Sequence, residues 1–140
     1  MNYLFIAYLS STLFMTGLIW MVQVVHYPLM GMVGQAQFVE YEAQHQQLIS
    51  LIVLPIMLIE LVTGAIYTLG TTHLSKTLLY IAFALLILIW CSTFFLQVPL
   101  HNRLSQGFDI VAHQKLVQTN WIRTLFWTVK SGLLLACIRH

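Results

Sequence analysis

From Met1 to Val39 the chain carries no aspartate, glutamate, lysine or arginine, and most of this stretch is apolar. An apolar run of ~20 residues can cross the ~30 Å hydrocarbon core of a bilayer as a helix, because a helix rises ~1.5 Å per residue. The run lacks the basic start of a secretory signal peptide and exceeds the usual length of its apolar region. We therefore expect residues 3–26 to form an uncleaved first membrane span.

The composition of the whole chain excludes an ordinary soluble domain. Charged residues make up 7% of the 140 residues and hydrophobic residues 59%. Soluble domains carry about a quarter charged residues, which keep a folded surface hydrated. The formal net charge of +2 is too small and too dispersed for a nucleic-acid partner. Cys91 and Cys137 lie in apolar runs without CxxC or zinc-ligand spacing, and we expect both to be small buried hydrophobes.

Three further apolar segments predict three more spans, so the fold class is all-α: an integral membrane four-helix bundle forming one domain over residues 1–140. Residues 35–47 are polar and favour helix, which predicts an interfacial helix before span two or a water-exposed extension of it. The fourth helix is expected to have a polar start from about Ile110. Prolines are expected to end spans one and three, at Pro28 and Pro99. No internal repeat is evident. The predicted spans are residues 3–26, 48–69, 78–98 and 119–138.

Four spans place both termini and the hairpin containing His73 on one membrane side, called side A. The linkers 27–47 and 99–118 then lie on the opposite side, called side B. Loop lysines and arginines are nearly balanced between the sides and lean slightly toward a cytoplasmic side A. The expected partners are the lipid bilayer and either further copies of this chain or a larger membrane complex.

Histidines gather at side B in this topology. Neutral imidazoles suit iron, copper or haem, and a helix bundle can hold such a cofactor between facing histidines. A single histidine near a membrane boundary is more often only interfacial. The convergence from four segments nevertheless predicts a metal or haem site, with His73 and His140 standing apart and exposed on side A. The four candidate ligands are His26, His45, His101 and His113.

Other polar side chains fall on helix faces at the same end. Polar residues in lipid face neighbouring helices, because hydrocarbon offers them no partners. Such stripes also occur as plain helix-packing contacts. We expect Gln97 to bind the cofactor beside the histidines, and Asn120 and Arg123 to orient the oxygens of a quinone or aromatic substrate. The third-span stripe comprises Trp90, Thr93, Gln97 and His101, and the fourth comprises His113, Asn120, Arg123, Trp127 and Lys130.

Two charges lie deep in the apolar spans. Glu60 is ~18 Å below the side-B end of span two and Lys130 is ~17 Å below that of span four, at ~1.5 Å per residue. Charges at this depth are costly unless paired, so the two side chains are predicted to meet. A structural ion pair and a catalytic or proton-transfer role both remain open for them.

Three segments carry a resemblance to a known family. Val25 to Pro28 (VHYP), Gln97 to Leu104 (QVPLHNRL) and Asn120 to Thr124 (NWIRT) resemble small four-helix bacterial membrane proteins, which are distantly similar to the anthrone-oxygenase-like membrane proteins. The resemblance implies a bacterial inner-membrane protein that oxidises a flat aromatic or quinonoid molecule, and the slight lean of lysines and arginines places both termini in the cytoplasm. It also implies that His101, Arg123 and Thr124 are site positions, with Thr124 near the cofactor.

Three functions are compatible with these patterns. The first is a membrane oxidoreductase or oxygenase acting on a quinonoid or aromatic substrate. The second is a non-catalytic membrane subunit or assembly factor, whose polar stripes would contact a larger partner. The third is a small proton or solute carrier, with Glu60 and Lys130 as midplane groups.

Overall fold

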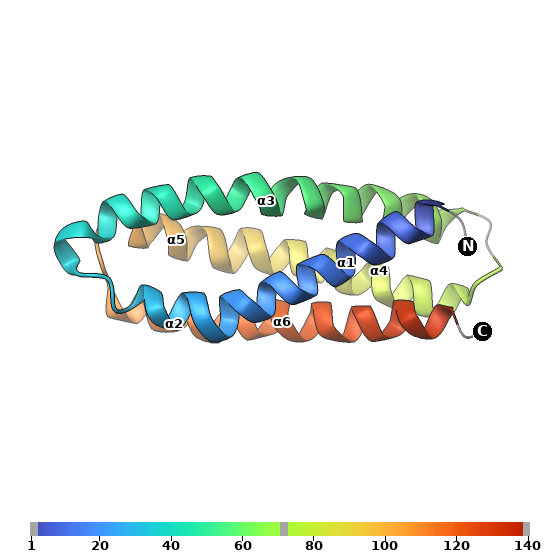
Figure 1. Cartoon of the computed structure of the whole chain (residues 1–140). Coiled ribbons are helices and arrows are strands. Elements are labelled where there is room, and N and C mark those ends of the chain that lie inside the picture. Colours follow the sequence, from blue (N-terminus) through green and yellow to red (C-terminus); the bar gives the residue numbers. More distant parts are fainter. Residues whose placement is uncertain (1–2, 71–72, 139–140) are drawn as a thin grey trace.

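The computed structural model describes residues 3–70 and 73–138, and all regular structure in this part of the chain is helical. Four long helices follow one another, and the predicted all-α fold is confirmed (Figure 1). The first consists of α1 (Tyr3–Met21), the π-helical turn η1 (Val22–His26) and α2 (Tyr27–Met30), and the second is α3 (Gln35–Leu69). The third consists of α4 (Lys76–Ser92), the π-helical turn η2 (Thr93–Gln97) and α5 (Val98–Leu104), and the fourth is α6 (Ile110–Cys137).

The long helices lie side by side (Figure 1). The helix α1 packs against both α3 and α6, and α6 packs along α4, whereas α3 approaches α4 and α5 less closely. The start of α1, the end of α6 and the connection from α3 to α4 lie at one end, which matches the predicted side A (Figure 1). The connections from α2 to α3 and from α5 to α6 lie at the other, side-B end.

Pro28 and Pro99, like Pro55 of α3, lie inside the long helices rather than at their ends. Proline lacks an N–H, and its ring clashes with the carbonyl four residues earlier. At Pro28 and Pro99 a wider turn precedes the proline, and the residue before it bonds five residues back: the N–H of Tyr27 donates to the Val22 carbonyl, and that of Val98 to the Thr93 carbonyl. The expectation that Pro28 and Pro99 end their helices is therefore corrected. The same π-helical turn thus precedes both prolines, which the sequence did not predict.

The polar segment 35–47 is the first part of α3, which is continuous to Leu69. The structure thus shows an extension of the second helix and no separate helix there. The predicted polar start of the fourth helix is confirmed, because α6 begins directly after Asp109. The Asp109 Oδ1 accepts backbone N–H bonds from Val111 at 2.9 Å and Ala112 at 3.0 Å, which caps the helix.

Three of the four helices are long and apolar enough to cross a membrane: Tyr3–Met30, Gln35–Leu69 and Lys76–Leu104. Large apolar side chains on their outward surfaces are well exposed, for example Leu51, Leu58 and Phe95. Contact of such an apolar surface with the lipid of a bilayer is favourable, whereas its exposure to water is not. The fourth helix is more polar, but many of its polar side chains are buried; they include Asn120, Arg123, Thr124 and Lys130.

The close approach of α1 and α3 depends on Gly64. A Cβ placed on Gly64 would lie 2.8 Å from Cε2 and 2.9 Å from Cζ of the buried Tyr8 ring. We expect Gly64→Ala to lower the stability of the detergent-solubilised protein by about 1–3 kcal/mol, the usual cost of overpacking. Gly17→Ala in α1 is the control, because its Cβ would meet nothing within 4 Å. Thermal unfolding in which both variants match the wild type would contradict this packing.

The cap on α6 predicts a pH-dependent contribution to stability. The Ala112 N–H bond, together with Arg103, lowers the pKa of Asp109. Stability from a carboxylate with a lowered pKa is complete above its ordinary pKa near 4 and is lost as the pH falls through the folded-state pKa. We therefore expect Asp109→Ala to lower the melting temperature at neutral pH, and this difference to shrink in acid. A difference that stays constant under acid titration would contradict the assignment.

Candidate functional site

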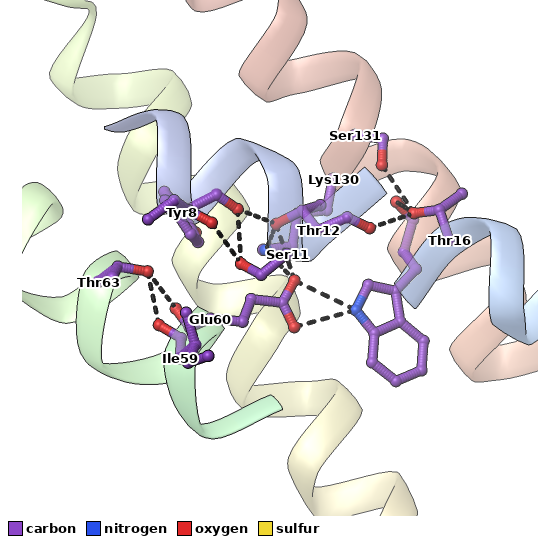
Figure 2. A network of polar contacts seen from close by, with 11 residues as sticks. Tyr8, Ser11, Thr12, Thr16, Ile59, Glu60, Thr63, Lys130 and Ser131 are labelled. Atoms are coloured by element: carbon purple, nitrogen blue, oxygen red, sulfur yellow. Dashed lines mark hydrogen bonds and ion pairs between the residues drawn. The ribbon is translucent and has the colours of Figure 1, made fainter. Parts of the chain in front are cut away.

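The predicted meeting of Glu60 and Lys130 is confirmed. Lys130 Nζ lies 2.5 Å from Glu60 Oε1, and both side chains are completely buried. Glu60 comes from the middle of α3 and Lys130 from α6, and Thr12 of α1 lies against the same carboxylate (Figure 2). Three helices therefore meet at one ion pair.

The donors around Glu60 occupy its carboxylate fully. Thr12 Oγ1 lies 2.8 Å from Glu60 Oε1 and 2.6 Å from Lys130 Nζ. Trp127 Nε1 donates to both carboxylate oxygens at 3.2 Å, and Lys130 Nζ also lies 4.4 Å from the centre of the Tyr8 ring. Such closure favours the structural reading of the pair, because no polar atom of the two charged groups is left for a substrate.

A second polar cluster lies at the side-B end, and its centre is a chain of three side chains. Glu42 Oε1 lies 2.6 Å from His101 Nδ1, and His101 Nε2 lies 3.0 Å from the Tyr27 hydroxyl. Arg123 NH2 donates to that hydroxyl at 3.4 Å. The chain thus joins α3, α5, α2 and α6. Gln46 also crosses from α3, donating to Glu42 Oε1 at 3.0 Å and to the His101 carbonyl at 3.3 Å.

Arg123 is held in place by neutral groups. Its Nε and NH2 donate to Asn120 Oδ1 at 3.0 and 2.5 Å, and the Asn120 amide donates to Gln23 Oε1 at 2.8 Å. Thr124 Oγ1 donates to the same Gln23 oxygen at 3.4 Å. The predicted site positions Asn120, Arg123 and Thr124 therefore belong to one network, in which Thr124 contacts Gln23 rather than Arg123.

Arg123 is a buried cation without a carboxylate partner. Its side chain is 8% exposed, and among the described residues the ion pairs are His101–Glu42, Arg103–Asp109 and Lys130–Glu60. The remaining acid, Glu40, accepts from Gln44 on the surface. A buried guanidinium whose acceptors are all neutral favours an additional oxygen acceptor.

Three of the four candidate histidines adjoin at this end. The rings of His26 and His45 stack with centroids 4.3 Å apart, and those of His45 and His101 lie 5.6 Å apart. His113 lies elsewhere: it is buried, and its Nε2 lies 2.7 Å from the Tyr27 carbonyl. On side A, His73 is exposed as predicted, whereas His140 is outside the described residues.

The four histidines do not form one ligand set. Metal coordination needs in-plane nitrogens that converge to ~2 Å from one point, whereas stacked rings direct their nitrogens along parallel planes. Both nitrogens of His101 already face Glu42 and Tyr27. The described residues hold no group of three or more histidine, cysteine, aspartate or glutamate side chains that could bind a metal ion. The expectation of four converging histidines is corrected in this respect.

A cavity of about 190 Å³ lies beside this cluster and is lined by residues of all four long helices. All four residues of the predicted third-span stripe line it, Trp90, Thr93, Gln97 and His101. Its body is apolar, and its polar end carries Tyr27, His45 and Arg123 as well. Three lining residues are also exposed on the outer surface, namely Leu54, Phe94 and Val98, so the cavity opens sideways between the helices.

Two buried polar atoms of cavity-lining residues have no partner among the described residues. Gln97 is 2% exposed; its amide nitrogen donates to Thr119 at 3.0 Å, but its Oε1 is unpaired. Trp90 Nε1, which belongs to another lining residue, is also buried and unpaired. The cavity therefore offers both a donor and an acceptor.

Two central residues of the cluster were missed in the sequence, Glu42 and Tyr27. Glu42 lies four residues before Gln46 and so shares its helix face, which is the one signal in the sequence that could have found it. Tyr27 lies near the end of the predicted first span, where tyrosines are common, and only its distance to His101 distinguishes it.

Comparison with protein-family models, curated proteins and solved structures finds no match for this chain.

The ion pair predicts an asymmetry between single and double substitutions. Removing one member of a buried pair strands the other charge and costs about 3–5 kcal/mol, whereas removing both can be nearly neutral. We expect Lys130→Met to lower the melting temperature in detergent markedly, and Lys130→Met with Glu60→Gln to recover part of the loss. Losses that are strictly additive would show that the two charges do not stabilise one another.

Proposed function

We propose that this chain is a four-span integral membrane protein that binds a lipid-soluble molecule with a flat aromatic or quinonoid head. The head would occupy the cavity beside α3, and its apolar tail would extend through the opening between α3 and η2 toward lipid. The fourth span in this proposal is α6, which packs along α1 and α4 and buries its polar face between them.

The unpaired polar atoms at an otherwise apolar cavity are the observation that carries this proposal. A buried polar atom without a partner costs about 1–3 kcal/mol, and a ligand oxygen or hydroxyl would remove that cost. A carbonyl oxygen fits Arg123, which has no anionic partner among the described residues, and a hydroxyl fits the unpaired Gln97 Oε1. Both groups occur on one ring in semi-reduced or hydroxylated quinones.

The position of the opening supports a ligand that arrives through the membrane. The exposed rim residues Leu54, Phe94 and Val98 are apolar and lie on helices long enough to span a bilayer. A lipid-soluble molecule can enter there without crossing water, and the polar end of the cavity then orients its head.

The reaction class in this proposal is oxidoreductase. A hydroquinone head bound here would lose two protons to side chains of the site and two electrons to a membrane haem or flavin protein. That acceptor gives a reason for the larger membrane complex expected from the sequence. The carrier hypothesis gains less support, because the Glu60–Lys130 network is closed by Thr12 and Trp127.

Binding can be measured with a decyl-substituted benzoquinone, which quenches tryptophan fluorescence; Trp90 and Trp127 line the cavity. We expect saturable quenching of the purified protein in lipid nanodiscs. Val53→Phe should abolish saturation by filling the cavity, and Arg123→Met should weaken binding at least tenfold, as about 1.5–3 kcal/mol is lost with a charged hydrogen bond.

Arg103→Met is the matched control, because the Arg103 side chain is 60% exposed and pairs with Asp109 away from the cavity. It should bind the quinone as the wild type does. Quenching of the wild type that never saturates, or that is the same in Val53→Phe, would overturn the proposed site.

A further inference from the structure

We infer that Tyr27, His101 and Glu42 form a proton relay that accepts the phenolic proton of the bound head group. This inference rests on the proposed function, since it concerns the same cavity. Tyr27 lies at the polar end of that cavity, and the relay leads from there to a buried carboxylate on α3.

The distances between the three side chains allow one continuous direction of hydrogen bonding. In the relay Glu42 starts as a carboxylate whose Oε1 accepts from His101 Nδ1, 2.6 Å away, so Nδ1 bears the hydrogen of a neutral ring. His101 Nε2 is then the acceptor, and the Tyr27 hydroxyl donates to it at 3.0 Å. All hydrogens therefore point the same way, from the cavity toward Glu42.

The surroundings of the Tyr27 oxygen suit it to receive a proton. Its hydrogen is directed at His101, and one lone pair accepts from Arg123 at 3.4 Å. The second lone pair is left for a ligand hydroxyl in the cavity. The Arg123 guanidinium also stabilises negative charge on any oxygen beside it, including the phenolate that the transfer creates.

The transfer balances as three linked proton shifts. The ligand O–H bond breaks and its proton joins the Tyr27 oxygen, while the Tyr27 proton moves to His101 Nε2. The proton on His101 Nδ1 moves to Glu42. The products are a ligand phenolate, an unchanged Tyr27, a neutral His101 in its other tautomer and a neutral Glu42. No electron moves in these steps.

Glu42 can hold the transferred proton. The residue is completely buried, and its Oε2 has no partner among the described residues. Gln46, which donates to Oε1, keeps the carboxylate against His101. A neutral carboxylic acid is easier to bury than a carboxylate, so this position suits a proton that waits for release.

Other titratable and charged groups face the relay from three elements. The His45 ring of α3 lies 5.6 Å from the His101 ring, and the His26 ring of η1 stacks on His45 at 4.3 Å. From α6, Arg123 NH2 donates to the Tyr27 hydroxyl, and His113 Nε2 lies 2.7 Å from the Tyr27 backbone carbonyl. Neither His26 nor His45 lies between Tyr27 and Glu42, so the relay does not pass through them.

The relay can be tested with 1,2-dihydroxyanthraquinone, a flat quinonoid phenol that changes colour on deprotonation. The dye is added to the full-length protein in nanodiscs while visible and infrared difference spectra are recorded. We expect the wild type to bind the dye as its phenolate and to gain the C=O stretch of a protonated carboxylic acid. Tyr27→Phe should still bind the dye but lose that infrared band, and Glu42→Gln should lose it too.

Tyr41→Phe is the matched control, because Tyr41 stacks near His45 but lies outside the relay; it should behave as the wild type. The relay is overturned if Tyr27→Phe retains the band, or if the wild type binds the dye in either colour without it. Failure of the wild type to bind the dye would instead overturn the proposed function, and the relay with it.

Discussion

The apolar surroundings of the helices impose the condition on which the rest of this structure depends: a polar side chain between them must find its partner on another helix. In hydrocarbon there is no water to solvate a stray charge, so Lys130 of α6 is stable only because Glu60 of α3 reaches it. Thr12 of α1 joins the same pair. One buried ion pair thus fixes the relative heights of three helices, which apolar packing alone would leave free to slide.

The two π-helical turns solve a second problem in the same environment. A proline within a helix removes a backbone bond and pushes a carbonyl aside, and neither defect can be repaired by water in a membrane. Turns η1 and η2 absorb the defects immediately before Pro28 and Pro99. They also carry Gln23, His26, Thr93 and Gln97, so the irregular backbone and the side-B polar cluster coincide. Such turns are frequent at functional sites, where an extra residue re-aims side chains.

Much of this could be predicted from the sequence, because the governing rules are local. Scarcity of charge and the length of the apolar runs predicted helices, and depth arithmetic along them predicted the contact of Glu60 with Lys130. The continuation of helices through Pro28 and Pro99 could not be predicted, since a π turn depends on packing rather than on residue type. Tyr27 and Glu42 were missed for a related reason: their partner His101 is distant in sequence, and only the packing of α2, α3 and α5 brings them together.

The two buried cations of α6, Lys130 and Arg123, have different surroundings. Lys130 and Arg123 occur on the same helix, seven residues apart, and both are buried. Lys130 is paired with Glu60, and neither of the two residues lines the cavity. Arg123 lines the cavity and has only neutral acceptors. A buried cation without an anionic partner lowers the stability of the fold, so stability alone would favour a carboxylate beside Arg123 as well. Glu42, one of the four acids of the chain, pairs with His101 and not with Arg123. In the proposed site, the positive charge of Arg123 is therefore available to a ligand oxygen. In the proposed relay, the carboxylate of Glu42, which pairs with His101 and not with Arg123, is the group that receives the proton.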